Sequence, residues 1–169
     1  MSVTRVRPPE RSALRITDLV SYRLGRVAHL ASRGAALRYR REFGVSLMEW
    51  RIVALLGGFA PMSLRDVAKE AGLDKGQASR AVSALHARGL VVRDVDSEDA
   101  RLVSLGLTRA GKTLYRGLMR AAAERNDVLA AALTPAERAS FDRALEKLAR
   151  AAQALIRAER EKAMVAEEI

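Results

Sequence analysis

The sequence predicts a mainly α-helical fold that carries a small two- or three-stranded β-sheet. Three observations predict it: apolar residues recur at helical spacing, helix start and stop signals are regular, and two short apolar runs flank a polar turn. The 169 residues are 49% hydrophobic and 30% charged, which is a globular composition with enough length to bury a core.

The same composition limits where the chain is expected to act. No apolar run approaches the roughly 18 residues that a membrane span needs. Residues 1–15 carry charges with no hydrophobic stretch behind them, so we expect no secretory signal. The sequence contains no cysteine, which excludes disulfides, thiol redox sensing and cysteine-based zinc sites. A cytoplasmic protein is therefore expected.

Four helix starts are marked by a side-chain acceptor and a polar partner three residues later, which together satisfy free backbone N–H groups. The pairs are Ser46 with Glu49, Ser63 with Asp66, Asp74 with Gln77, and Thr134 with Glu137. Helices are expected to stop at Gly44, Gly57–Gly58, Gly72 and Gly89.

With the apolar spacing, these signals predict helices at 17–42, 47–57, 64–71, 75–88, 109–132 and 135–162, and extended runs at 90–95 and 101–107. Between 64 and 107 the order is helix, glycine-containing turn, helix and hairpin. That order is typical of a winged helix-turn-helix, whose second helix enters the major groove of DNA.

The distribution of charge agrees with a polyanionic partner. The formal net charge is +10. Residues 1–41 hold ten arginines against two acids, and residues 75–93 hold four basic residues and no acid. The alternative is a chain that uses arginine freely on solvated surfaces.

The helix predicted at 75–88 has two unlike faces when its residues are projected at about 100° each. Its inner face is apolar and consists of Ala78, Ala81, Val82 and Leu85. Its outer face holds Gly76, Arg80, Ser83 and Ala87, flanked by Gln77 and Ser79. Small residues let a backbone lie deep in a groove, and arginine can bind guanine O6 and N7 together. A packing face of small residues is the alternative interpretation.

The predicted DNA-binding residues lie on this helix, at the preceding cap and in the hairpin turn. They are Ser63, Lys75, Gly76, Gln77, Ser79, Arg80, Ser83, Arg88, Asp99 and Arg101. In the turn, the Asp99 carboxylate can brace the Arg101 guanidinium for entry into a narrow minor groove. The alternative is that Asp99 only supports the turn.

The run "SLRDVAKEAGLDKGQASRAVSALHARGLVVRDVDSEDARLVSLGLTRAG" resembles the DNA-binding core of the MarR family of bacterial transcription regulators. The matching motifs are A-x-x-x-G-L from Ala68, the S-R pair at Ser79, the G-L pair at Gly89, D-x-R at Asp99, and L-T-x-x-G from Leu107. The layout resembles the family over about residues 17–160. A family wing often carries Pro and a further Arg where this chain has Ser97 and Ala100, which leaves this wing less basic.

The resemblance implies a homodimer that reads a palindrome in double-stranded DNA, commonly as a repressor released by a small ligand. It implies a helical dimerisation lobe formed by 17–45 and 109–165, and a winged helix-turn-helix DNA-binding lobe at 46–108. The Arg- and Pro-containing composition of the N-terminal residues predicts a mobile basic arm at 1–16. The sequence adds support of its own, because an apolar seam in the last helix needs a partner helix. The seam comprises Phe141, Leu145, Leu148, Ala152 and Leu155.

An effector site is expected on the first helix, opposite its apolar stripe of Val20, Leu24, Val27 and Ala31. The candidate residues are Tyr22, Arg26, His29 and Arg33, with Met48, Trp50 and Met62 nearby. Two guanidinium groups beside aromatic rings favour an anionic ligand, such as an aromatic or CoA-linked acid. The alternative is a solvated or interface face of a basic helix.

Other classes of function find little support in the sequence. No phosphate-binding glycine loop, nucleophile elbow or catalytic His/Asp/Ser set is present, so we do not expect an enzyme. With two histidines and no acid cluster at ligand spacing, no metal site and no cofactor is expected. A winged helix used as an architectural or protein-interaction module stays open as the alternative to a sequence-specific regulator.

Overall fold

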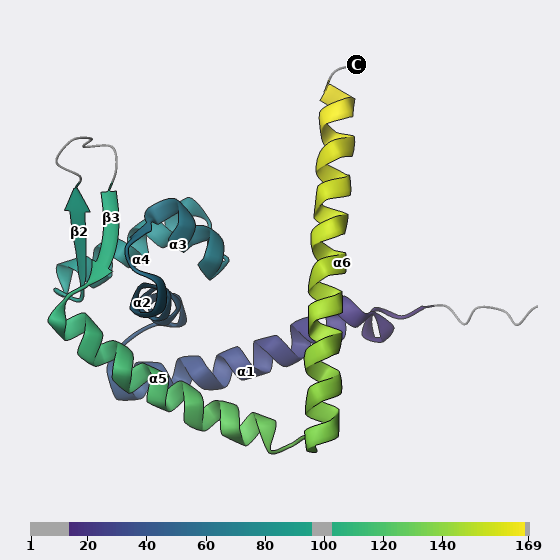
Figure 1. Cartoon of the computed structure of the whole chain (residues 1–169), viewed down its shortest axis with the longest axis horizontal. Coiled ribbons are helices and arrows are strands. Elements are labelled where there is room, and N and C mark those ends of the chain that lie inside the picture. Colours follow the sequence, from purple (N-terminus) through teal and green to yellow (C-terminus); the bar gives the residue numbers. More distant parts are fainter. Residues whose placement is uncertain (1–13, 96–102, 168–169) are drawn as a thin grey trace, which may run out of the picture. The chain divides into compact units, whose positions relative to one another are not determined.

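The computed structural model describes residues 14–95 and 103–167. The chain forms two compact units, one ending at Ala121 and the other beginning at Ala122. Figure 1 follows the elements: η1 Ile16–Asp18, α1 Val20–Phe43, α2 Leu47–Phe59, β1 Met62–Ser63, α3 Leu64–Ala71, α4 Lys75–Ala87, β2 Val91–Val95, β3 Val103–Leu107, α5 Arg109–Ala130 and α6 Pro135–Glu167. The predicted fold class is confirmed. The sequence also predicts an arm, a dimerisation lobe and a DNA-binding lobe. This division is based on the role of each segment, so it stays a prediction.

The predicted helix starts are confirmed by their hydrogen bonds. The Ser46 hydroxyl accepts from the Glu49 N–H at 3.2 Å, and the Glu49 carboxylate accepts from the Ser46 N–H at 2.7 Å. The pairs that begin α4 and α6 make equivalent reciprocal bonds. At the start of α3 the Ser63 hydroxyl accepts from the Asp66 N–H at 3.1 Å, without the reciprocal backbone bond. Three of the predicted stops, at Gly44, Gly72 and Gly89, have φ between +64° and +66°, where glycine is favoured.

The predicted stop at Gly57–Gly58 is wrong. Helix α2 continues through both glycines to Phe59, and the Ala60 N–H still donates to the Leu56 carbonyl at 3.2 Å. Gly57 has a different purpose, because a Cβ there would collide with the ring of Tyr115 on α5. Its missing side chain allows α2 and α5 to pack closely.

The sheet is antiparallel with strand order β1-β3-β2. The two predicted extended runs form β2 and β3, which pair from Val91 with Leu107 to Val95 with Val103. The third strand, β1, is only two residues long and pairs Met62 with Leu105. Such a short strand leaves no periodic signal in the sequence.

The core of the first unit joins α1, α2, α4, the sheet and the start of α5. Its largest fully buried side chains include Tyr39, Ile52, Leu85, Leu105 and Leu118. The Tyr39 ring lies 4.9 Å from the Trp50 ring, centroid to centroid, which ties α1 to α2.

The first turn of α5 is fixed to the end of α4. The Thr108 hydroxyl donates to the Gly89 carbonyl at 2.7 Å and accepts from the Gly111 N–H at 3.0 Å, as a helix cap does. A Cβ at Gly111 would collide with the Leu90 carbonyl oxygen. These contacts hold the turn between α4 and β2 against α5.

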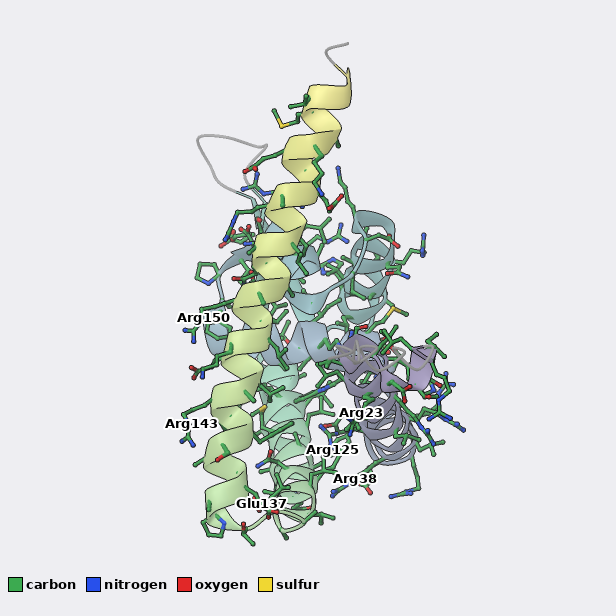
Figure 2. All side chains as sticks on the ribbon, turned by 90° about the vertical axis from the view of Figure 1, so that its right-hand side faces the viewer. Arg23, Arg38, Arg125, Glu137, Arg143 and Arg150 are labelled. Atoms are coloured by element: carbon green, nitrogen blue, oxygen red, sulfur yellow. The ribbon has the colours of Figure 1, made fainter. Side chains whose placement is uncertain are left out.

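Helix α6 dominates the second unit and leaves its apolar residues open. From 135 to 165 every side chain except that of Ala158 is exposed. The predicted seam is exposed with the rest, from Leu145 at 38% to Leu155 at 67%. Arg143 and Arg150, two turns apart, project from the same side of α6 (Figure 2). No helix in the described part of the chain is long and apolar enough to cross a membrane.

Candidate nucleic-acid interface

Helix α4 has the two faces that its sequence predicts. Its inner residues Ala78, Ala81, Val82 and Leu85 are at most 8% exposed. On its outer face Gly76, Arg80, Ser83 and Ala87 are exposed, and the flanking Gln77 and Ser79 are half-buried. The polar face is therefore open to a partner.

Arg80 lies back over the first turn of α4. A Cβ added at Gly76 would stand 3.3 Å from the Arg80 guanidinium and 3.2 Å from the Asp74 carboxylate. Helical side chains lean toward the N-terminus, so a residue at i+4 covers position i. Gly76 thus leaves room for the guanidinium beside the N-terminal end of α4.

The cations on α3 form ion pairs with acidic side chains, whereas in the described part of the chain those at the start and on the outer face of α4 do not. On α3, Arg65 lies 3.8 Å from the Asp66 carboxylate and Lys69 lies 3.4 Å from the Glu70 carboxylate. Within residues 14–95 and 103–165, neither Lys75 nor Arg80 forms an ion pair. The positive charge of the α4 surface is available to an anionic partner.

Ser63 and Arg88, both among the predicted DNA contacts, have structural partners. The Ser63 hydroxyl donates to the Asp66 carboxylate at 2.7 Å and caps α3. The Arg88 guanidinium donates to the Glu49 carboxylate at 3.1 Å. Arg88 also follows the C-terminal end of α4, about 20 Å along the axis from Lys75. Both residues hold helices in place, and their contact with DNA stays a prediction.

Arg93 on β2 is a candidate that the predicted set omits. Its guanidinium donates to the Ser83 hydroxyl oxygen on α4 at 2.8 Å. The sequence signal was present, since Arg93 ends the acid-free run from Lys75. Its reach to α4 depends on how β2 packs, which no local pattern specifies.

Comparison with known proteins finds relatives of the segment that carries this surface. The family model described as "MarR family" matches residues 43–102, which include all of α4 and β2. This segment of the chain matches the MarR family. The HTH-type transcriptional regulator FarR of Neisseria gonorrhoeae is 31% identical over 88 residues, which cover 52% of this chain and 60% of FarR. The match thus spans only about three fifths of that relative.

Solved structures of other proteins share the fold. A MarR/EmrR family regulator from Acinetobacter sp. ADP1 is 26% identical, with a TM-score of 0.76 over 83% of this chain and 99% of its own. The MepR–DNA complex from S. aureus is 21% identical, with a TM-score of 0.72 over 79% of this chain and 98% of its own. At that identity the second likeness concerns the fold alone.

The two remaining predicted DNA contacts belong to the predicted wing. Asp99 and Arg101 lie outside the described residues. The contact in which the Asp99 carboxylate braces the Arg101 guanidinium stays a prediction.

The predicted effector residues do not gather in one cavity of the described structure. Tyr22, Arg26, His29 and Arg33 are exposed along α1, and none lines a described pocket. Trp50 and Met62 line two different pockets, and Met48 is 40% exposed. Residues on one face of a helix do not show which other elements pack against that face. The effector site on α1 therefore stays a prediction, and no described pocket supports it.

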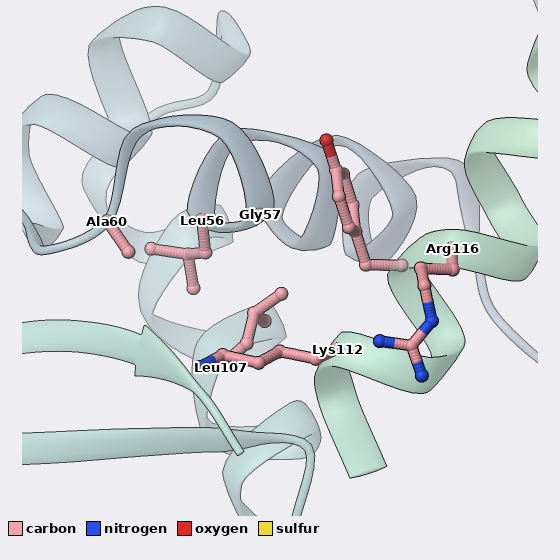
Figure 3. Close-up of a pocket in the computed structure, with 7 residues that line it drawn as sticks. Leu56, Gly57, Ala60, Leu107, Lys112 and Arg116 are labelled. Atoms are coloured by element: carbon pink, nitrogen blue, oxygen red, sulfur yellow. The ribbon is translucent and has the colours of Figure 1, made fainter. Parts of the chain in front are cut away.

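A pocket of about 280 Å³ lies between α2, the end of β3 and α5. It is lined by Leu56, Gly57, Ala60, Leu107, Lys112, Tyr115 and Arg116. Figure 3 shows Leu56 of α2 and Ala60, just after that helix, across from Leu107 and Lys112. The lining combines an apolar floor and one phenol ring with two cations one turn apart, and it includes no acid.

Proposed function

We propose that this chain is a sequence-specific DNA-binding regulator of transcription, in which α4 enters the major groove. The observation that carries the proposal is the outer face of α4, which is exposed, free of acids and built of small residues around Arg80. Arg80 provides the forked donors that recognise guanine, and Lys75 suits a nearby phosphate. A regulator of this kind acts in the cytoplasm with its DNA, and we propose no catalytic role.

We further propose that the regulator is a homodimer on a palindromic operator. The support is the open apolar surface of α6, where Phe141, Leu145, Leu148 and Leu155 are all more than a third exposed. A second α6 would cover this surface. Two-fold symmetry would place the two copies of α4 about one turn of DNA apart. A bound dimer that covers a promoter would act as a repressor.

Release by a small anionic effector completes the proposal, and the pocket beside Tyr115 supports it. Lys112 and Arg116 can bind a carboxylate while the apolar floor takes an aromatic ring. The pocket adjoins Thr108 and Gly111, which hold the end of α4. A ligand that shifts the first turn of α5 would therefore move α4.

Selection of bound duplexes from random DNA tests the main proposal. We expect a palindrome with half-sites about ten base pairs apart, bound far more tightly than a scrambled duplex. Equal affinities for selected and scrambled duplexes would instead favour the architectural or protein-interaction module.

Two double variants test the effector site with benzoate and its hydroxylated derivatives as probes. We expect Lys112→Ala with Arg116→Ala to abolish the ligand-induced rise in thermal stability. Arg26→Ala with Arg33→Ala, on the exposed stripe of α1, should leave that rise intact. The reverse pattern would move the effector to α1, and an absence of any response from the wild-type protein would end this part of the proposal.

A further inference from the structure

Two side-chain contacts fasten β2 alongside α4. The His86 ring lies 2.9 Å from the Val91 carbonyl oxygen, and the Arg93 guanidinium donates to the Ser83 hydroxyl oxygen at 2.8 Å. Ser83 and His86 are three residues apart and share one side of the helix. Val91 and Arg93 are two residues apart and share one face of the strand. The strand therefore runs back alongside the helix, and the contact further along α4 is the one nearer the start of β2.

The position of Arg93 on the strand explains why it reaches the outer face of α4. Val91, on the same face, is 1% exposed and belongs to the core. Arg93 and Ser83 are both exposed, so the shared face of β2 passes from the core to the surface between 91 and 93. The next residue, Asp94, lies on the opposite face of the strand. Arg93 thus gives the outer surface of α4 a cation that the helix itself does not supply.

The hydrogen bond to Ser83 leaves most of the guanidinium unused. Arginine has five N–H donors and no acceptor, and the Ser83 oxygen takes one of them. Arg93 makes no ion pair within residues 14–95 and 103–165. Because the Ser83 oxygen accepts this bond, its hydroxyl hydrogen is also free to donate. The pair presents donors at its open side, which suits a group that only accepts.

We propose that Arg93 contacts DNA, binding a backbone phosphate at the rim of the major groove, and that Ser83 is its positioning residue. The proposal rests on the proposed function, since it requires α4 to occupy that groove. A phosphate fits better than a base edge, because Arg93 comes from the flanking strand rather than the centre of the outer face. Phosphate oxygens are acceptors, and they bind arginine through paired charged hydrogen bonds.

The test compares Arg93→Gln with Arg80→Ala on a selected duplex and a scrambled duplex across a range of salt concentrations. For Arg93→Gln we expect about tenfold weaker binding to both duplexes and a salt slope lowered by about one, with unchanged base preference. Arg80→Ala should instead reduce discrimination between the duplexes. Arg120→Gln, which removes the same charge from the exposed surface of α5, should change neither property.

Three further variants separate a contact from a merely structural role. Arg93→Lys keeps the charge and should keep the wild-type salt slope with intermediate affinity. Ser83→Ala should weaken binding, and Ser83→Ala with Arg93→Gln should lose less than the product of the two single losses. Thermal unfolding of each variant shows that the fold is retained.

The outcomes distinguish this inference from the proposed function. If the wild-type protein prefers its selected duplex but Arg93→Gln matches it in affinity and salt slope, the inference is overturned and the regulator stands. If Arg93→Gln loses base preference at an unchanged salt slope, Arg93 reads a base and the phosphate contact is wrong. If the wild-type protein does not discriminate at all, the proposed function itself fails.

Discussion

Glu49 in the first turn of α2 and Arg88 at the end of α4 form an ion pair, although 39 residues separate them. The Glu49 side chain is only 14% exposed, and its second carboxylate oxygen accepts from the Ser46 N–H. One carboxylate therefore caps α2 and also holds the far end of α4. The orientation of α4 is fixed at the end opposite Arg80.

Glu49→Gln separates these two roles, because glutamine can still cap the helix but carries no charge. We expect a loss of about 1 kcal/mol in the free energy of unfolding, measured by denaturant titration. Glu159→Gln, which breaks a far more exposed pair with Lys162, should cost close to nothing. A Glu49→Gln variant as stable as the wild-type protein would show that the pair is dispensable.

Arg80→Ala should relax base preference at one position of each half-site. Removing a forked contact to guanine costs roughly 1–3 kcal/mol of discrimination there. Lys75→Ala is the matched control, since loss of a phosphate contact weakens binding to all sequences alike. Affinities for single-base variants of the selected duplex give the result, and an unaltered preference in Arg80→Ala would remove Arg80 from the reading residues.

Gly111→Ala should destabilise the protein, whereas Gly58→Ala should not. The added methyl group at Gly111 meets the Leu90 backbone carbonyl, which cannot move without disturbing the end of α4. We expect a loss above about 2 kcal/mol. Gly58 lies in a helix with nothing within 4 Å of its Cβ position, so alanine there should add about 0.5–1 kcal/mol. Thermal unfolding of the two variants makes the comparison.

Leu145→Glu should dissociate the proposed dimer. The substitution puts a charge in the middle of the open apolar seam of α6, where desolvation in a helix pair is costly. Sedimentation velocity should show the mass halving, and binding to a palindromic duplex should weaken sharply. Lys147→Glu changes charge even more on the same helix but outside the seam, and it should remain dimeric. A dimeric Leu145→Glu protein would contradict the proposed interface.

Acid should weaken the start of α6. The backbone N–H and hydroxyl of Thr134 donate to the Glu137 carboxylate and hold its pKa below the ordinary value of 4.5. The folded state therefore binds this proton less readily than the unfolded chain does. The resulting stabilisation is present above pH 4.5 and is lost as the pH falls through the lowered pKa. The unfolding midpoints of wild-type protein and Glu137→Gln should thus converge on acidification, and parallel curves would exclude this contribution.

Local signals predicted most of the fold. The cap at Ser46 depends on Glu49 three residues away, and the two faces of α4 follow from helical geometry alone. Both are properties of short segments, so the sequence specifies them directly. The same reasoning predicted the residues that surround Arg80 on the outer face.

Features that depend on packing between distant segments could not be predicted in this way. Gly57 resembled a helix stop, since glycine often ends helices. Its real reason, close packing against Tyr115, was not visible because Tyr115 lies far along the chain on α5. The contacts of Arg88 with Glu49 and of Arg93 with Ser83 depend equally on how whole elements meet. The pocket beside Tyr115 also brings α2, β3 and α5 together, and no single segment reveals it.

The sparse outer face of α4 has an evolutionary consequence. Few long side chains on it can carry information about bases, and none of them belongs to the hydrophobic core. After gene duplication, one or two codon changes at such positions would redirect a copy to a new set of promoters while leaving folding intact. Under the proposed function, a scaffold of this kind would let copies of the regulator change their targets without losing the fold.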